Sequence, residues 1–315
     1  MRQARKPPPK SIRGLVLINA LLVVAALSAV AVLLLQTAET ARNRQYYVQE
    51  VAQTQAYLDG FELLLRSLLD ADRARGNVDH SKEPWAQKNY TVEIDRGHVS
   101  GTLRDLQGRF NLNWLAGGDS SFGPEAFKAL MQGIGQRSSL TSAIMDWVSE
   151  DGPQDLTPYL VRSPGLSPVG GNVELLDELR LVKGITPDIF TRLEAVLTAV
   201  PSEGVININT APRAVLQALM PKVSSAVIGA LVAERNGEPF ETDEAVYIYL
   251  QGVLSEEELE KVPSGVFVTS SHWFEAEISA TLGQTQLRRR VIFRRSGESG
   301  KTRVAYRLTP KEDTW

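Results

Sequence analysis

The stretch LVLINALLVVAALSAVAVLLL, residues 15–35, is almost wholly apolar and decides how this chain is organised. As an α-helix with a rise of about 1.5 Å per residue it would be roughly 31 Å long, which matches the hydrocarbon core of a bilayer. We therefore predict that residues 15–35 form a transmembrane helix.

The segment before this apolar stretch is basic and ends in a small residue, Gly14. By the positive-inside rule the N-terminus stays in the cytoplasm and the chain after the helix lies across the membrane, which is the periplasm if the source is a Gram-negative bacterium. A secretory signal peptide has its small-residue cleavage site after the apolar run, and none follows here. Two interpretations remain: a basic leader, residues 1–14, that is cut off after Gly14, or an ordinary single-span anchor. The five positive charges of the segment are Arg2, Arg5, Lys6, Lys10 and Arg13.

The helix is predicted to continue far beyond the membrane. Between Leu15 and Asp59 the chain has neither proline nor glycine, and Gly60 costs only about 1 kcal/mol relative to alanine. Apolar residues then recur at alternating spacings of four and three, which predicts a helix with one buried face up to about Leu69. The residues of this stripe are Tyr47, Val51, Thr54, Leu58, Phe61, Leu65 and Leu68.

Alternating apolar and polar residues, typical of strands, occur on both sides of a long helical region that runs from about Pro124 to Leu259. Strands that flank a helical block in this way can close one antiparallel sheet, so we predict an α+β fold with the block inserted into the sheet. The predicted strands are residues 90–94 and 99–104 before the block, and residues 266–270, 274–280, 288–294 and 303–308 after it.

Composition excludes several function classes. The net charge of −3 argues against a general polyanion binder, and the absence of cysteine means that no disulfide framework is needed. The three histidines, His80, His98 and His272, are far apart, and the motifs H-E-x-x-H, G-x-S-x-G and the P-loop are absent. We therefore expect a protein that is not an enzyme.

Two segments of the helical block are similar to helix-hairpin-helix units, which often present backbone N–H groups to DNA. They are residues 181–185 and residues 205–211, where Thr210 is predicted to cap the next helix with Pro212 in its first turn. The usual second glycine is missing after Gly184, and residues 174–262 hold 7 basic against 15 acidic side chains. Such a surface repels phosphate, so packing or protein contact is favoured and a DNA-uptake receptor is the alternative.

Two further groups of polar residues have local explanations. Asp146, Asp151 and Asp155 lie within ten residues and suit Ca²⁺, but they also fit a turn and a solvated helix face, and both interpretations stay open. In residues 105–113, DLQGRFNLN, Asp105 and Gly108 indicate a turn, and the two asparagines are expected to bond their own backbone.

Taken together, three features resemble one family, minor pseudopilin K of the bacterial type II secretion system. Arg13-Gly14 before the apolar helix resembles a prepilin peptidase site, and residues 105–113 resemble the family segment D-x-x-G-R-F-N-L-N. The third feature is an ordered set of short motifs. These are Asp146-Trp147, then Glu178-Leu179 with Val182 and Gly184, and then residues 207–212, NINTAP.

The resemblance implies a pseudopilin fold, in which a long N-terminal helix packs on an antiparallel sheet, with a large all-α insertion of two SAM-like, helix-hairpin-helix-like subdomains. It implies cleavage between Gly14 and Leu15, and it implies that the freed Leu15 amine is the site of methylation. The implied organisation is leader 1–14, transmembrane helix 15–35 continuing to about 69, first strands 85–110, SAM-like regions 111–202 and 203–262, and C-terminal strands 263–310.

The resemblance also implies a place and partners: the tip of a periplasmic pseudopilus, with minor pseudopilins I and J, the major pseudopilin and the prepilin peptidase, and no nucleic acid. Major pseudopilins have a glutamate at the fifth mature position, where this chain, counted from Leu15, has Asn19. An unpaired charge in lipid costs several kcal/mol, so asparagine suits a subunit with nothing above it. The family's Gly-Ala-Glu-Asp loop, linked to calcium, has no counterpart in residues 151–159, so we expect no cofactor, with calcium as the one open alternative.

Overall fold

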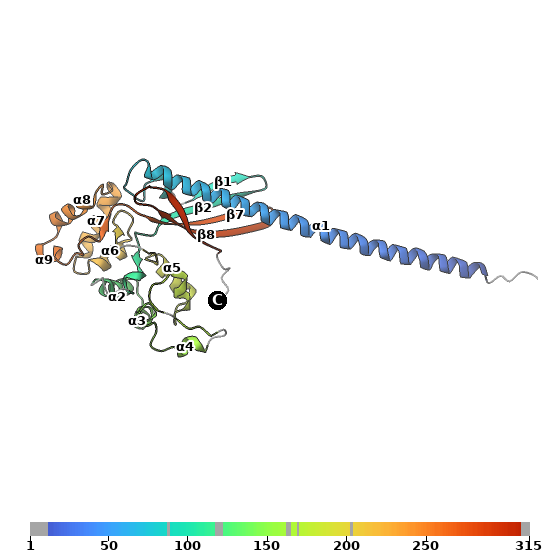
Figure 1. The fold of residues 1–315 in the computed structure, drawn as a ribbon, viewed down its shortest axis with the longest axis horizontal. Helices are drawn as coiled ribbons and strands as arrows, with labels where there is room; N and C mark the ends of the chain where they lie inside the picture. The colour runs from blue at the N-terminus through green and yellow to red at the C-terminus, as the bar shows by residue number, and fades with distance from the viewer. Residues whose placement is uncertain are drawn as a thin grey trace, which may run out of the picture.

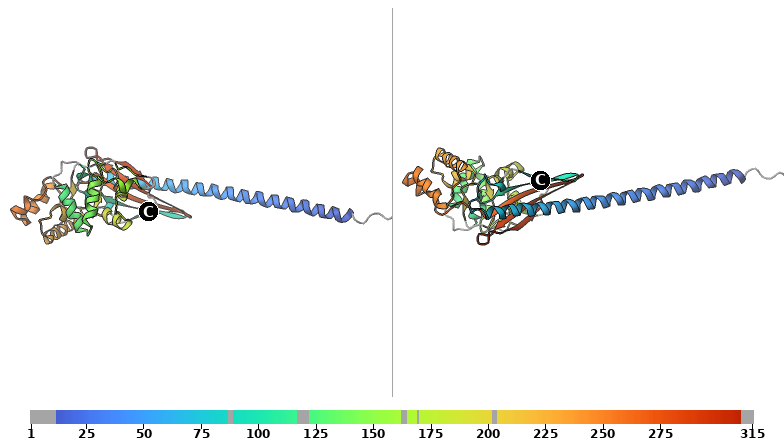
Figure 2. Two further views of the ribbon diagram at one scale, coloured as in Figure 1. Left: turned by 90° about the horizontal axis from the view of Figure 1, so that it is seen from below. Right: turned by 90° about the horizontal axis from the view of Figure 1, so that it is seen from above.

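The computed structural model describes residues 12–86, 89–116, 122–161, 165–168, 170–201 and 204–309. Its dominant feature is helix α1 (Ile12–Arg73), which at about 1.5 Å per residue is roughly 93 Å long. Figure 1 shows α1 projecting from one end of a sheet, while the other helices gather at the opposite end. The two views in Figure 2 show the same separation.

The first part of α1 contacts nothing else in the described chain, whereas its last turns are buried on the sheet. Residues 15–49 are exposed, and the hydropathy of the segment fits one membrane span. From Thr54 onward the predicted stripe is confirmed, with Leu58, Phe61 and Leu65 buried. The helix ends at Arg73, a turn later than predicted, and Leu69 rather than Leu68 is fully buried there.

The sheet that receives α1 has five antiparallel strands in the order β1-β2-β7-β8-β9. Strand β2 pairs with β7 from Gly97↔Leu282 to Asp105↔Phe274, so neighbours in space are separated by the whole helical block. This pairing confirms the predicted insertion. The strands are β1 (Tyr90–Ile94), β2 (Gly97–Asp105), β7 (Trp273–Leu282), β8 (Thr285–Arg295) and β9 (Thr302–Leu308).

A glycine in the middle of β2 allows close packing between helix and sheet. A Cβ atom at Gly101 would lie 2.8 Å from the ring of Phe61 and 2.9 Å from the Glu277 carbonyl oxygen. Only glycine therefore lets the Phe61 ring rest on the strand at this point.

The inserted block has its own core, separate from the core between α1 and the sheet. Its elements are the helices α2 (Gly123–Gly133), α3 (Ser138–Trp147), α4 (Thr157–Leu160), α5 (Pro187–Glu194), α6 (Arg213–Leu219), α7 (Ser225–Gly237), α8 (Asp243–Val253) and α9 (Glu256–Leu259), with the 3₁₀ helices η2 (Leu112–Trp114) and η3 (Leu176–Leu181) and the short parallel pairs β3 (Phe110–Asn111) with β4 (Leu197–Thr198) and β5 (Ile206–Asn207) with β6 (Phe267–Val268). A further 3₁₀ helix, η1 (Pro84–Ala86), lies between α1 and β1.

Two local predictions were wrong. The strand predicted at residues 266–270 is the two-residue β6, which pairs with β5 instead of joining the large sheet. Thr210 does not cap α6, because α6 begins at Arg213, after Pro212, and the Thr210 hydroxyl group bonds a side chain of the large sheet. In the hairpin-like segment predicted at residues 181–185, the chain turns at Gly184, which has φ +92° and lies between η3 and α5.

Candidate functional site

The residues expected to be processed lie at the start of α1. Leu15 and Asn19 are exposed on the helix, and Gly14 lies in its first turn. The structure tests neither cleavage at Gly14 nor the role of Asn19, so both stay predictions. The leader upstream of Ile12 lies outside the described residues.

The carboxylates singled out in residues 146–155 are used by the local backbone. Asp146 Oδ2 accepts a hydrogen bond from the Gln154 N–H (3.2 Å), and Asp155 Oδ1 accepts one from the Thr157 N–H (3.0 Å). The bonds from Thr157 hold the pKa of Asp155 below its ordinary value. Within the described ranges, these aspartates are not gathered into one group of three ligands; the group that is so gathered is Asp72, Asp79 and Glu83.

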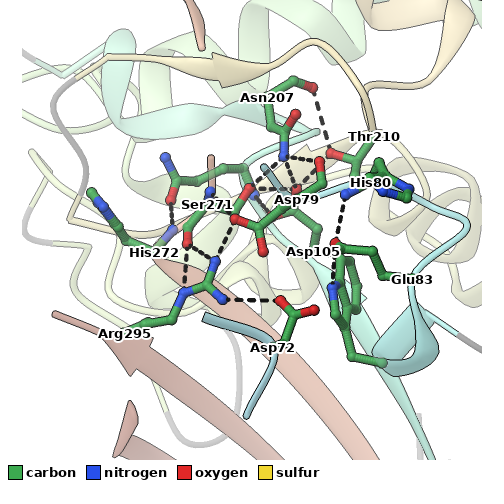
Figure 3. Close-up of polar contacts among 12 residues, drawn as sticks. Asp72, Asp79, His80, Glu83, Asp105, Asn207, Thr210, Ser271, His272 and Arg295 are labelled. Atoms are coloured by element: carbon green, nitrogen blue, oxygen red, sulfur yellow. Dashed lines mark hydrogen bonds and ion pairs between the residues drawn. The ribbon is translucent and has the colours of Figure 1, made fainter. Parts of the chain in front are cut away.

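The motifs of the sequence meet at a buried polar junction between the sheet and the helical block (Figure 3). Asp105, the last residue of β2, is its centre. Its Oδ1 accepts the Gln107 N–H (2.8 Å), and its Oδ2 accepts the hydroxyl groups of Thr210 (2.5 Å) and Ser271 (2.6 Å) and the amide of Asn207 (3.2 Å). Burial raises the pKa of Asp105 to about 6, against the opposing effect of the Ser271 and Thr210 hydrogen bonds.

Asn207 ties three segments of the chain together. Its side-chain amide donates to the Asp79 carbonyl oxygen (3.0 Å), to Asp105 Oδ2 and to Ser271 Oγ (2.8 Å). Its Oδ1 accepts the Asn209 N–H (2.9 Å). The NINT segment therefore joins the helical block to both the sheet and the segment after α1.

The asparagines of the DLQGRFNLN segment act beyond their own backbone. Asn111 Oδ1 accepts the Asn113 N–H as expected, but its amide also donates to the Val200 carbonyl oxygen (2.8 Å). Asn113 pairs with the backbone of Val173, accepting its N–H (2.8 Å) and donating to its carbonyl oxygen (3.0 Å). These side chains fix the start of the block against two distant loops.

Arg295 at the end of β8 supplies the positive charge of the junction, and it is not among the residues singled out from the sequence. Its guanidinium forms ion pairs with Asp79 and Asp72 (3.4 Å to the latter) and donates to the Ser271 carbonyl oxygen (2.7 Å). Arg295 is 2% exposed. Strand period could have revealed it, because Arg295 follows Val291 and Phe293 at every second position of the buried face.

A second set of contacts joins the block to the other face of the sheet. Arg290 of β8 forms ion pairs with Asp177 of η3 and with Glu194 of α5, and it lies 3.4 Å from Glu275 of β7. Burial raises the pKa of Glu275 to about 7, although the positive charge of Arg109 acts in the opposite direction. The two polar sets hold the block on the sheet from two sides, and this is a structural role.

Comparison with known proteins agrees with this architecture. Two protein-family models, both described as "Type II secretion system (T2SS), protein K", match this chain. One matches residues 108–202 and the other residues 206–267, and together these ranges make up the helical block. The type II secretion system protein K of Klebsiella pneumoniae is 27% identical over 91% of this chain and 94% of its own length. That of Pseudomonas aeruginosa is 26% identical over 93% and 92%.

Among solved structures, the complex of GspK, GspI and GspJ from the type 2 secretion system of enterotoxigenic Escherichia coli contains a chain with the same fold. The TM-score is 0.72 at 22% identity, covering 85% of this chain and all of the other. A long N-terminal helix that is apolar at its start and packs on an antiparallel sheet defines this chain as a pseudopilin. Within that class it belongs to the type II secretion system protein K family.

Proposed function

We propose that this chain is the minor pseudopilin at the tip of the type II secretion pseudopilus, where it joins pseudopilins I and J and primes or caps assembly. The observation that carries the proposal is the fold. It matches the whole length of one chain in a solved complex of GspK with GspI and GspJ. The bulky helical block at the end of the sheet opposite the membrane helix also supports a terminal place in the fibre. The proposal assigns no catalytic step to the chain.

The exposed part of α1 between membrane and sheet is the surface that this proposal requires for helix packing. Tyr46, Tyr47 and Val48 are 56–63% exposed there, just beyond the predicted span. Aromatic side chains dominate protein interfaces because they bury a large area with few rotatable bonds. Asn19 supports the tip position, because it brings no carboxylate that a subunit above would have to neutralise.

Co-purification tests the assembly. The tagged full chain, extracted in detergent from cells that also express pseudopilins I and J, should retain both partners. Tyr47→Glu should reduce their recovery at least about tenfold, because it places a charge in an interface core. Ile248→Glu is the matched control, since Ile248 on α8 is equally exposed (67%) but distant from α1. The proposed packing would be contradicted if Tyr47→Glu still retained both partners, or if the control variant lost them to the same extent.

We further propose that the prepilin peptidase cuts between Gly14 and Leu15 on the cytoplasmic face of the inner membrane, leaving the helix anchored. Co-expression with the peptidase should shorten the chain by residues 1–14, as measured by intact mass. Gly14→Val should block this cleavage, because a β-branched side chain no longer fits a site that selects glycine. Gly60→Ala is the control: it changes another glycine of α1 that has open space around it, and cleavage should continue. A shortened Gly14→Val product would overturn the assignment.

A further inference from the structure

Three carboxylates converge where α1 ends and the chain turns toward the sheet. Asp72 lies in the last turn of α1, Asp79 in the following loop, and Glu83 just before η1. One oxygen from each can be chosen so that all lie within 4.8 Å of one another. The three residues span only eleven positions and form one compact oxygen cluster, and Figure 3 shows all three beside the Asp105 network.

Each carboxylate uses one oxygen for protein donors in the described structure. Asp79 Oδ2 accepts the Ser271 N–H (2.7 Å) and pairs with Arg295. Glu83 Oε2 accepts the His80 N–H (2.8 Å) and the Trp85 indole N–H (2.7 Å). Asp72 Oδ2 faces Arg295. A side-chain hydrogen bond also links Asp72 to Glu83, whereas the second oxygen of Asp79 remains for another ligand.

Asp79 shows that this second ligand is needed. The residue is 1% exposed, and its Oδ1 is buried with no hydrogen-bond partner among the described residues. A buried carboxylate oxygen without a partner is costly, and native proteins satisfy such atoms with water or an ion. Arg295 supplies one positive charge against the three carboxylates, so the balance of charge favours a cation.

The kind and number of the ligands select the ion. Calcium takes six to eight oxygen ligands in a flexible geometry, so three carboxylates completed by water suit it, whereas magnesium needs a near-ideal octahedron. The three oxygens lie within 4.8 Å of one another, which is close enough for one ion to contact all three. Glu83 is only half-buried, which leaves room for water to enter and complete the coordination.

We propose that Asp72, Asp79 and Glu83 bind one Ca²⁺ ion that fastens the end of α1 to the loop before the sheet. This site is separate from Asp146, Asp151 and Asp155. It does not depend on the proposed place of the chain in the pseudopilus. The ion joins Asp72 at the end of α1 to Asp79 and Glu83 in the loop that follows, next to the polar junction. It therefore stabilises the folded chain by a free energy that rises with the logarithm of the Ca²⁺ concentration once that concentration exceeds the dissociation constant.

Terbium luminescence tests the site, because Tb³⁺ replaces Ca²⁺ at oxygen ligands and emits when a nearby tryptophan is excited. Trp85 donates to Glu83, so its indole is next to the proposed ion. The full chain in detergent should give saturable Tb³⁺ emission on tryptophan excitation, and Ca²⁺ should displace it. Ca²⁺ should also raise the unfolding temperature relative to a chelator. Trp85→Phe should lose the emission and keep the Ca²⁺-dependent rise.

Substitutions of the proposed ligands distinguish this site from the aspartates of residues 146–155. Glu83→Gln keeps an acceptor for His80 and Trp85 at a half-buried position, so it should fold and yet bind Tb³⁺ roughly 10–100-fold more weakly. Asp72→Asn should weaken binding similarly. The matched control is the double variant Asp151→Asn with Asp155→Asn. It changes carboxylates four and eight positions after Trp147 in the sequence and should leave the affinity unchanged. Unaltered binding in both ligand variants, loss of binding in the control, or no saturable binding to the unmodified chain would overturn the proposal.

Discussion

Replacing Asp105 by alanine should lower the free energy of unfolding by about 4 kcal/mol or more, one of the two largest effects that we expect for a single substitution. The side chain accepts four hydrogen bonds, from Gln107, Asn207, Thr210 and Ser271. Alanine removes every acceptor at once, and each buried donor left without a partner costs roughly 1–3 kcal/mol. Urea unfolding of the full chain in detergent, followed by tryptophan fluorescence, measures the loss.

Two companion variants show whether the loss comes from this network. Asp105→Asn keeps one carbonyl oxygen, and the hydroxyl groups of Thr210 and Ser271 can rotate to accept from the new amide, so the loss should be clearly smaller. Asp95→Ala removes an exposed aspartate near the β1–β2 turn and should change stability by no more than about 0.5 kcal/mol. If Asp105→Ala is no less stable than Asp95→Ala, Asp105 does not hold the junction.

Periodicity explains why most of the fold could be predicted from the sequence. The apolar span, the 4-3 stripe of Leu58, Phe61 and Leu65, and the alternation in β7 are local signals, and one buried face is enough to produce them. The order of these signals along the chain, with strands on both sides of the helical block, was enough to predict that the block is inserted into the sheet. The pairing of β5 with β6 could not be predicted, because the strand signal at residues 266–270 does not say which strand it joins and the two-residue β5 is too short to show a period.

The polar junction could be predicted only in part, because its partners are distant in sequence. Asp105 and Asn207 were both singled out as motif residues, but nothing local indicates that they touch across 102 positions. Thr210 precedes a helix and is a residue type that often caps helix N-termini. Its hydroxyl group instead donates to the distant Asp105, and this tertiary contact overrides the local preference for capping. Arg295 was overlooked because arginines are frequent in β8 and only its place on the inward face distinguishes it.

Replacing Arg295 by methionine should cost about 3–5 kcal/mol, because it leaves the buried carboxylates of Asp72 and Asp79 without their counter-charge. Methionine retains most of the apolar bulk that packs near the Phe274 ring, so the loss reports mainly on the charge. Arg288→Met, at an exposed position of the same strand, should change little. Urea unfolding with a chelator present throughout measures both, since no bound metal ion can then replace the guanidinium.

The double variant Arg295→Met with Asp72→Asn distinguishes an unpaired charge from a simple packing defect. Asp72 pairs with Arg295, and burial together with the nearby Glu83 raises its pKa to about 7, so its charge is already unfavourable in the folded state. Neutralising it should therefore restore part of the stability that Arg295→Met loses, giving a double-variant loss smaller than the sum of the single losses. Strictly additive losses would mean that the arginine acts through packing alone, and that the charge balance of the junction does not decide its stability.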